Sequence, residues 1–491
     1  MSFTELSFFV FLPSVFIFHF ALPKQLRWIF LLIASYTFYM AWKPVYVLII
    51  IAISLIDYSA GRLMGAAPNQ RRRKLWLLLS LASNIGILFV FKYFNFIFES
   101  IQDVMHAFGS SAHFPMLSLL LPIGLSFHTF QSISYTIDVY LRRVEPVTHL
   151  GKFALYVSFF PQLVAGPIER GTGLLPQFFE NRMFDLNKAR HGLKLMAWGF
   201  FKKLVIADQI APFVATAYAS PHSFTGPSLL IATFLFSYQI YCDFSGYTDI
   251  ARGAANILGY DLRMNFDRPY ASRSVSEFWR RWHMSLSSWF RDYVYIPLGG
   301  SRVGQMRYVL NIMITFLLCG LWHGANWTFV IWGALNGVYL VVGHFTESFR
   351  MKLIVILGTV LPAVVIDQSR RLTTFLLISI GWIFFRSSDA HTAWYILTHV
   401  FSGGKQFLGE LAQGNLSHAI FIDNSPAQFA SVLKGIIILE FLEWLIATGK
   451  LSQEFTQVPR AMRFFVYVLA TLTIFLMSNL TQPQQFIYFR F

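Results

Sequence analysis

One histidine inside an apolar stretch is the residue of this sequence best placed to do chemistry. His323 lies in residues 321–327, which read Leu-Trp-His-Gly-Ala-Asn-Trp. Ionisable side chains are costly inside a membrane and are therefore candidates for function, and an imidazole can accept or donate a proton near neutral pH. The alternative is a histidine that is hydrogen-bonded by a neighbouring helix and has only a structural role.

A second histidine belongs to residues 275–294, whose spacing predicts one amphipathic helix. His283 falls on or beside its apolar face, which is formed by Val275, Phe278, Trp279, Trp282, Leu286, Trp289, Phe290 and Tyr293. Such a helix suits a membrane interface, and a plain anchor is one interpretation. In the other, the helix lines the mouth of a cavity, and Arg280, Arg281 or Arg291 meets phosphate groups, which guanidinium groups bind well.

Polar residues also cluster at 237–252, close to a membrane boundary. Because an isolated buried charge is costly, Asp243, Asp249 and Arg252 must pair with one another or face a wet cavity, and an architectural role is favoured for all three. Residues 159–170 are too broken by Pro and Gly for a straight span. They fit a re-entrant turn that ends in Glu169 and Arg170, which are expected to form a local pair or a headgroup contact.

The elements that position these residues are membrane helices. The chain has 491 residues, of which 55% are hydrophobic and 13% charged, against about 25% charged in ordinary globular proteins. We expect an all-α polytopic protein with about ten to twelve spans in a single domain, residues 1–491. The apolar runs cover residues 6–22, 28–42, 45–56, 75–98, 116–140, 229–241, 309–321, 327–342, 353–366, 372–385, 433–446 and 464–480.

Charge gives orientation. Basic residues 71–74 and Arg142–Arg143 flank a loop, residues 99–115, that has no Lys or Arg. The positive-inside rule makes the basic loops cytoplasmic and the N-terminus extracytoplasmic. The net charge of +15 then reflects orientation and contact with anionic lipids, and no nucleic-acid motif accompanies it. The first apolar run lacks a cleavage site and is expected to remain as a span.

Cys242 and Cys319 predict no disulfide, and no metal site is expected because they have no metal-ligand spacing.

Four motifs in order carry a resemblance. They are Asp243-Phe-Ser245-Gly-Tyr-Thr-Asp249, Glu277-Phe-Trp-Arg-Arg-Trp-His283, Arg291-Asp-Tyr-Val-Tyr-Ile-Pro-Leu-Gly-Gly300 and Gly320-Leu-Trp-His323-Gly. The sequence resembles the membrane-bound O-acyltransferase family, in particular the bacterial alginate O-acetylase branch with its peptidoglycan and other polysaccharide relatives. The likeness runs from near the first span to the final residues 486–491. Cys242 and His128 depart from the aromatic and the tyrosine usual in that family. His128 is either an additional polar group in the cavity or, as we favour, a core histidine.

The resemblance implies a ring of helices around a central tunnel in the bacterial inner membrane. It implies His323 as the central catalytic residue, His283 as the second functional histidine, and acetyl-CoA as a cytoplasmic donor substrate with no permanently bound cofactor. Trp322, Asn326, Asp243 and Ser245 are expected to support the site. The acceptor is an extracytoplasmic polysaccharide such as alginate, and a periplasmic partner enzyme is expected to carry the acetyl group to it.

Acetyl transfer to a hydroxyl needs a base, a proton route to the thiolate and stabilisation of an oxyanion. We expect His323 to be the base and His283 or Asn326 to orient or polarise the reacting groups. A relay in which the imidazole itself carries the acetyl group for one step stays open. Peptidoglycan or another exopolysaccharide is an alternative acceptor, and acylation by a longer chain is an alternative reaction. A sugar transporter without catalysis is the rival from another class, although the repeat symmetry typical of transporters is not apparent.

Overall fold

The structure is a computed structural model, and it describes the whole chain except residues 112, 165, 450–457, 478–483 and 490–491. The described residues contain helices and turns but no β-strand, which confirms the all-α class. They form two compact units, residues 1–196 with 248–264, and residues 197–247 with 265–490. The single domain expected from the sequence stays a prediction.

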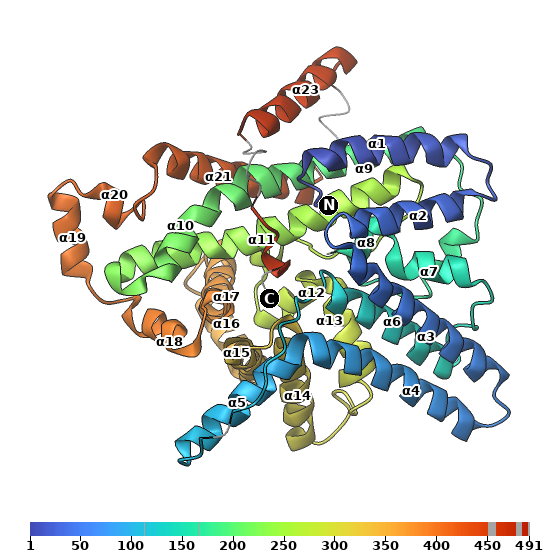
Figure 1. Ribbon diagram of the computed structural model, residues 1–491. Helices are drawn as coiled ribbons and strands as arrows, with labels where there is room; N and C mark the ends of the chain where they lie inside the picture. The colour runs from blue at the N-terminus through green and yellow to red at the C-terminus, as the bar shows by residue number, and fades with distance from the viewer. Residues whose placement is uncertain (112, 165, 450–457, 478–483, 490–491) are drawn as a thin grey trace. The chain divides into compact units, whose positions relative to one another are not determined.

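The first unit holds the N-terminal helices, blue to teal in Figure 1. They are α1 (Leu6–Ala21), α2 (Arg27–Met40), η1 (Pro44–Tyr46), α3 (Val47–Ala66), α4 (Gln70–Leu88), the π-helix η2 (Phe89–Tyr93), α5 (Phe94–Ala107), α6 (Leu125–Tyr140), α7 (Leu150–Ser158), α8 (Phe160–Leu163), η3 (Leu175–Phe178) and most of α9 (Leu186–Phe200).

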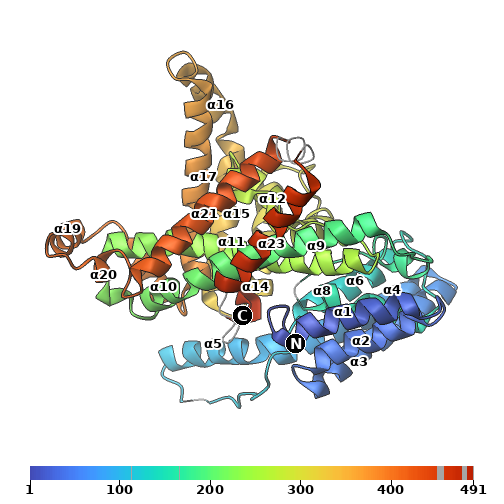
Figure 2. The same ribbon diagram turned by 90° about the horizontal axis from the view of Figure 1, so that it is seen from above.

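A buried carboxyl joins α3, α4 and α6, which pack against one another and lie side by side in Figure 1; Figure 2 shows the same unit from above. Asp57 of α3 accepts hydrogen bonds from Ser80 (2.6 Å) and Asn84 (2.9 Å) of α4, and from Ser132 of α6. The guanidinium of Arg73 is also buried and donates to carbonyl oxygens of Met64, Val139 and Tyr140 at 2.9–3.0 Å. Arg73 therefore satisfies the C-terminal carbonyls of α3 and α6, so not all of the basic run at 71–74 meets solvent.

The second unit contains the remaining elements. They are η4 (π, Phe201–Ala207), α10 (Asp208–Ala219), η5 (Pro221–Ser223), the first part of α11 (Gly226–Ile257), η6 (Pro269–Ala271), α12 (Val275–Arg281), α13 (Met284–Phe290), η7 (π, Arg291–Tyr295), α14 (Gln305–His323), α15 (Trp327–Phe345), α16 (Glu347–Leu357), α17 (Ala363–Arg386), α18 (Ala390–His399), α19 (Gly404–Ala412), α20 (Leu416–Ala419), α21 (Pro426–Ala447), α23 (Arg460–Met477) and η8 (Ile487–Phe489).

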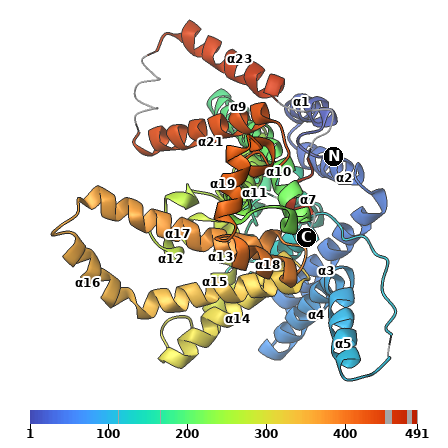
Figure 3. The ribbon, with the colours of Figure 1, turned by 90° about the vertical axis from the view of Figure 1, so that its left-hand side faces the viewer.

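Close packing of α14 against α15 positions the candidate site. The two helices form the most extensive helix pair in the structure and run next to each other in Figure 3. Gly320 and Gly333 face each other across the contact: a Cβ on Gly320 would lie 2.2 Å from the carbonyl oxygen of Phe329. Small residues let membrane helices approach closely in this way, and His323 follows Gly320 by one turn.

Four described helical stretches are long and apolar enough to cross a membrane: Pro44–Ala66, Gln70–Ala107, Gln305–His323 and Trp327–Phe345. The total of ten to twelve spans stays a prediction. Two predicted runs are wrong as single spans. The run at 116–140 becomes helical only at Leu125, and the run at 353–366 is broken between Leu357 and Ala363, where Pro362 has no N–H to continue a helix. Figure 3 shows this turn between α16 and α17.

Candidate active site

His323 is the last residue of α14 and is 3% exposed. Aromatic rings surround its imidazole, with centroids 4.9 Å (Trp322), 4.9 Å (Trp332), 5.2 Å (Phe385) and 5.6 Å (Tyr488) away. The residue predicted to be catalytic therefore lies in packed protein surroundings within the second unit. The tunnel expected around it stays a prediction.

The loop after His323 is held by Asn326. Its Oδ1 accepts the backbone N–H of Thr328 at 2.9 Å, which caps α15, and its Nδ2 donates to the carbonyl oxygen of Ser388 at 3.1 Å. Both ends of the amide are thus engaged with backbone groups. This is the geometry of a residue that fixes the turn between α14 and α15, next to the imidazole.

His283 lies in a break that the sequence did not predict. The single helix expected at 275–294 is wrong: α12 ends at Arg281, and α13 starts at Met284. His283 has a left-handed backbone with φ of +43°, which is uncommon for a residue other than glycine and costs about 1–2 kcal/mol. Asn265 stabilises the break, because its carbonyl oxygen and Oδ1 accept the N–H groups of Met284 (2.9 Å) and Ser285 (3.3 Å).

The break leaves the apolar face largely as predicted. Every residue of the expected stripe is buried except Tyr293, which lies in η7 and is partly exposed. The side chain of His283 is 1% exposed, and burial lowers its pKa to about 3, so the ring is neutral at physiological pH. This segment lies outside the four stretches of the described residues that are long and apolar enough to cross a membrane.

The two histidines share aromatic neighbours. The indole of Trp322 lies 5.9 Å from His283 and 4.9 Å from His323 between ring centroids. Phe244 of α11 lies 4.7 Å from His283 and 4.4 Å from Tyr488, which in turn contacts His323. The structure thus gathers two imidazoles, an indole, a phenol and a phenyl ring from α14, the α12–α13 break, the C-terminal segment and α11.

The three candidate arginines differ in their surroundings. Arg281 pairs with Glu277 at 2.8 Å and with Asp267 at 3.9 Å, and Arg291 pairs with its neighbour Asp292 at 2.8 Å. Arg280 is exposed and makes no ion pair with any described residue. An anionic ligand that binds Arg280 would therefore not have to displace a carboxylate of a described residue, as it would at Arg281 or Arg291.

Asp243 is paired, as expected, but with a residue that the sequence analysis missed. Its Oδ1 lies 2.7 Å from Nζ of Lys203, and Lys203 also lies 2.8 Å from Oδ1 of Asp208. Asp249 and Arg252, which belong to the first unit, form a separate pair at 3.5 Å. Ser245 is buried on α11 beside Phe244.

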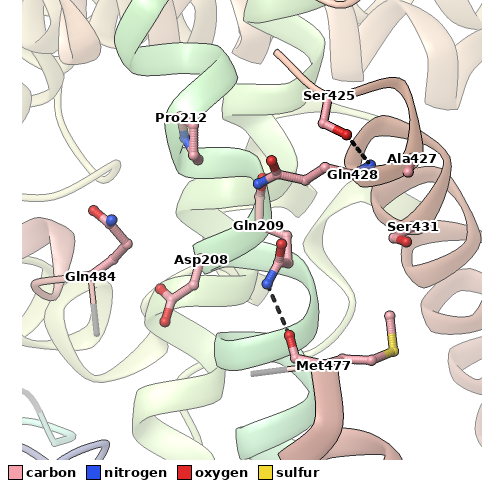
Figure 4. Close-up of a pocket in the computed structure, with 9 residues that line it drawn as sticks. All are labelled: Asp208, Gln209, Pro212, Ser425, Ala427, Gln428, Ser431, Met477 and Gln484. Atoms are coloured by element: carbon pink, nitrogen blue, oxygen red, sulfur yellow. Dashed lines mark hydrogen bonds between the residues drawn. The ribbon is translucent and has the colours of Figure 1, made fainter. Parts of the chain in front are cut away.

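A cavity of about 470 Å³ borders Asp208 (Figure 4). Amide and hydroxyl side chains contribute to its wall beside apolar groups, and Gln209 donates a 2.9 Å hydrogen bond to the carbonyl oxygen of Met477. The lining residues are Asp208, Gln209, Pro212, Ser425, Ala427, Gln428, Ser431, Met477 and Gln484.

The other predicted polar residues lie in the first unit. His128 is 1% exposed on α6, and its ring nitrogens make no hydrogen bond with a described residue. Residues 159–170 are broken as expected, with α8 followed by irregular backbone. Oε1 of Glu169 accepts the backbone N–H of Arg263 at 2.7 Å, and burial raises the pKa of Glu169 to about 7.

Sequence reasoning gave no role to Tyr488, Lys203 or Asp208. Tyr488 lies in a C-terminal run, Phe486-Ile-Tyr-Phe-Arg-Phe491, whose aromatic character was visible. Lys202 and Lys203 interrupt a region of apolar residues, and such a charge signals a partner or a function. Only the fold identifies that partner.

Comparisons with known proteins identify the family of the chain. A model of the membrane-bound O-acyltransferase family matches residues 142–355. The chain is 39% identical to the probable alginate O-acetylase AlgI of Pseudomonas aeruginosa over 83% of this chain and 76% of that protein. It is 32% identical to a peptidoglycan O-acetyltransferase of Helicobacter pylori over 89% and 88% of the two chains.

A more distant likeness covers about half the chain. A teichoic acid D-alanyltransferase of Streptococcus thermophilus is 31% identical over 46% of this chain and 57% of its own length. The sequence identities to the two O-acetyltransferases, 39% and 32%, extend over more than four fifths of this chain and are higher than a shared fold alone requires. The chain belongs to the membrane-bound O-acyltransferase family and is an acyltransferase.

Proposed function

We propose that the protein transfers acetyl groups from cytoplasmic acetyl-CoA across the inner membrane for O-acetylation of an extracytoplasmic polysaccharide. The observation that carries the proposal is the convergence of His323 and His283 on Trp322 in a buried aromatic environment. The alginate and peptidoglycan acetyltransferases among the relatives support this substrate class. The non-catalytic transporter is set aside because the family is one of acyltransferases.

In the proposed reaction, an acceptor hydroxyl oxygen attacks the carbonyl carbon of the thioester. His323 takes the hydroxyl proton as the new C–O bond forms. When the tetrahedral intermediate collapses, the C–S bond breaks, and the imidazolium returns the proton to the departing thiolate. One imidazole thus serves as base and acid, and atoms and charge balance without a redox partner.

Neighbouring groups would stabilise the negative oxygen of the intermediate. A neutral imidazole at His283 can donate one N–H hydrogen bond, and the hydroxyl of Tyr488 can donate another. Donors that are already in place in water-excluded surroundings contribute strongly to such stabilisation. Asn326 contributes by fixing the turn that follows His323.

On the donor side, we propose that Arg280 meets a phosphate group of acetyl-CoA. It has no ion pair among the described residues, whereas Arg281 and Arg291 already contact carboxylates. Arg280→Gln should raise the KM for acetyl-CoA with little change in kcat. Arg291→Gln is the matched control, and an equal effect of both substitutions, or of neither, would remove Arg280 from the donor site.

The proposed orientation has the N-terminus outside and the basic loops in the cytoplasm. A hydroxyl on a periplasmic partner enzyme is the proposed immediate acceptor, because a polymer is too large to enter a site packed as tightly as that of His323. The partner would then pass the acetyl group to the polysaccharide. Alginate is our first candidate, and peptidoglycan or another exopolysaccharide is the second, since relatives of both named kinds cover most of the chain.

The decisive experiment replaces His323 by Ala in a strain that lacks the native gene. Transfer of radiolabelled acetyl from acetyl-CoA to the cell-envelope polymer fraction should be lost, while the amount of protein in the membrane stays unchanged. His344→Ala is the matched control, because His344 lies on α15 and packs against Tyr308 away from this set of rings. Retained transfer in His323→Ala would end the proposal. Separating the labelled polymers then distinguishes alginate from peptidoglycan.

A further inference from the structure

The C-terminal segment, residues 484–489, is attached to its unit by two charged side chains. Oδ2 of Asp243 accepts the backbone N–H of Ile487 at 2.7 Å. Nζ of Lys203 donates to the carbonyl oxygen of Gln484 at 3.1 Å. These bonds join α11 and η4 to residues that follow them by more than two hundred positions.

The same two side chains belong to a buried ion triad. Lys203 bridges Asp243 (2.7 Å) and Asp208 (2.8 Å), and the three side chains are only 2%, 4% and 13% exposed. Burying three charges is costly, and breaking such a set by removing one partner is often more costly still. The triad carries one more negative than positive charge, and its Asp243 end faces the C-terminal backbone.

The attachment of residues 484–489 by these two bonds, called seating below, positions the aromatic side chains of the segment. The ring of Phe486 stacks on Tyr247 at 4.6 Å, and Tyr488 packs on Phe244 at 4.4 Å between centroids. Phe244 and Tyr247 follow Asp243 on α11, so one helical turn provides both the hydrogen bond and the aromatic platform. The result is the 5.6 Å contact between Tyr488 and His323.

We propose that Lys203 and Asp243 are positioning residues that hold the C-terminal segment so that Tyr488 stays beside His323. Asp208 balances the charge of Lys203 but does not contact the segment in any described bond. The inference rests on the proposed function only for the role of His323. The seating itself is independent of which acyl group or acceptor the enzyme uses.

The two carboxylates provide a matched pair of substitutions. Asp243→Leu removes the bond to Ile487 and leaves Lys203 paired with Asp208. Asp208→Leu changes the net charge by the same amount and leaves the bridge from Lys203 through Asp243 to Ile487 in place. Lys203→Met is avoided, because it would leave two buried carboxylates without a cation and could prevent folding.

Seating is measured by cysteine labelling in the full-length protein. Ile487→Cys keeps the backbone N–H that bonds to Asp243, and the side chain at this position is 6% exposed. The two natural cysteines, Cys242 and Cys319, are also buried. The introduced thiol should react slowly with a polar maleimide in detergent-solubilised protein. Adding Asp243→Leu should accelerate labelling about tenfold or more, since a hydrogen bond to a charged group changes a local opening equilibrium by at least that factor. Adding Asp208→Leu should leave the rate unchanged.

Equal acceleration of labelling by both substitutions would show a general loosening of the fold and would overturn the inference. An unchanged labelling rate in both variants would overturn it as well. Acetyl transfer supplies the second readout: Asp243→Leu should lower kcat, with an unchanged KM for acetyl-CoA. Faster labelling together with full activity would refute the positioning role. A protein that carries both His323→Ala and Ile487→Cys should be labelled at the same rate as Ile487→Cys alone. Loss of the proposed function and loss of seating are therefore observed separately.

Discussion

Gly320 lies where α14 and α15 approach most closely, and Gly320→Ala tests whether this approach positions His323. The added Cβ would lie 2.2 Å from the carbonyl oxygen of Phe329 and 3.3 Å from Cα of Gly333, whereas ordinary contacts begin at 3.4 Å. Because both nearest neighbours are backbone atoms, no side chain can rotate away. The two helices must separate by about 1 Å to restore ordinary van der Waals contact.

The expected effects follow from that displacement. Inserting a methyl group into a packed interface costs about 1–3 kcal/mol. A shift of about 1 Å at a reacting group can lower a rate about 100-fold, and His323 follows Gly320 by one turn. We therefore expect Gly320→Ala to lower acetyl transfer by about two orders of magnitude, and to lower the thermal unfolding midpoint as well.

The assay compares acetyl transfer and thermal unfolding in detergent for Gly320→Ala and for a control, Gly86→Ala. Gly86 is also inside a helix, α4, but a Cβ there meets no atom within 4 Å. Alanine at position 86 should stabilise the helix by about 0.5–1 kcal/mol. Normal activity and an unchanged midpoint for Gly320→Ala would refute the reasoning that this contact positions the imidazole.

Three further predictions concern single contacts. Tyr488→Phe keeps the ring packing but removes the hydroxyl, and acetyl transfer should fall about 100-fold with an unchanged unfolding midpoint; full activity would remove Tyr488 from the site. Asn326→Ala loses the cap of α15 and should cost about 1 kcal/mol, measured as a lower unfolding midpoint. His418 is partly buried, which lowers its pKa, but its bonds to Asp423 and to the carbonyl oxygen of Ser223 raise it more, for a net increase. Because the folded pKa exceeds the unfolded one, this stabilisation is complete below about pH 6.5 and is lost as pH rises through the raised pKa. Amide exchange of the loop around Ser223 should therefore accelerate with pH beyond its intrinsic dependence, and His418→Gln should remove the excess.

The sequence alone determined the class of the protein and singled out His323 and His283 as candidate functional residues. Apolar composition and run length are local properties, and they suffice to predict membrane helices. Within residues 275–294, the helical periodicity also identified most of the side chains that the structure buries in that segment. His323 stood out because an ionisable group in an apolar run is unusual wherever the run lies in the fold.

Only the tertiary structure decided how these residues meet. At the helix break, backbone N–H groups after His283 donate to Asn265, and next to Tyr488 the backbone N–H of Ile487 donates to Asp243, 244 positions earlier in the chain. Neither contact has a period or a spacing that could be recognised along the chain. Helix periodicity reports which face is apolar, but hydrogen bonds between distant segments depend on how the chain returns on itself, and that is set by the packing of all the helices together.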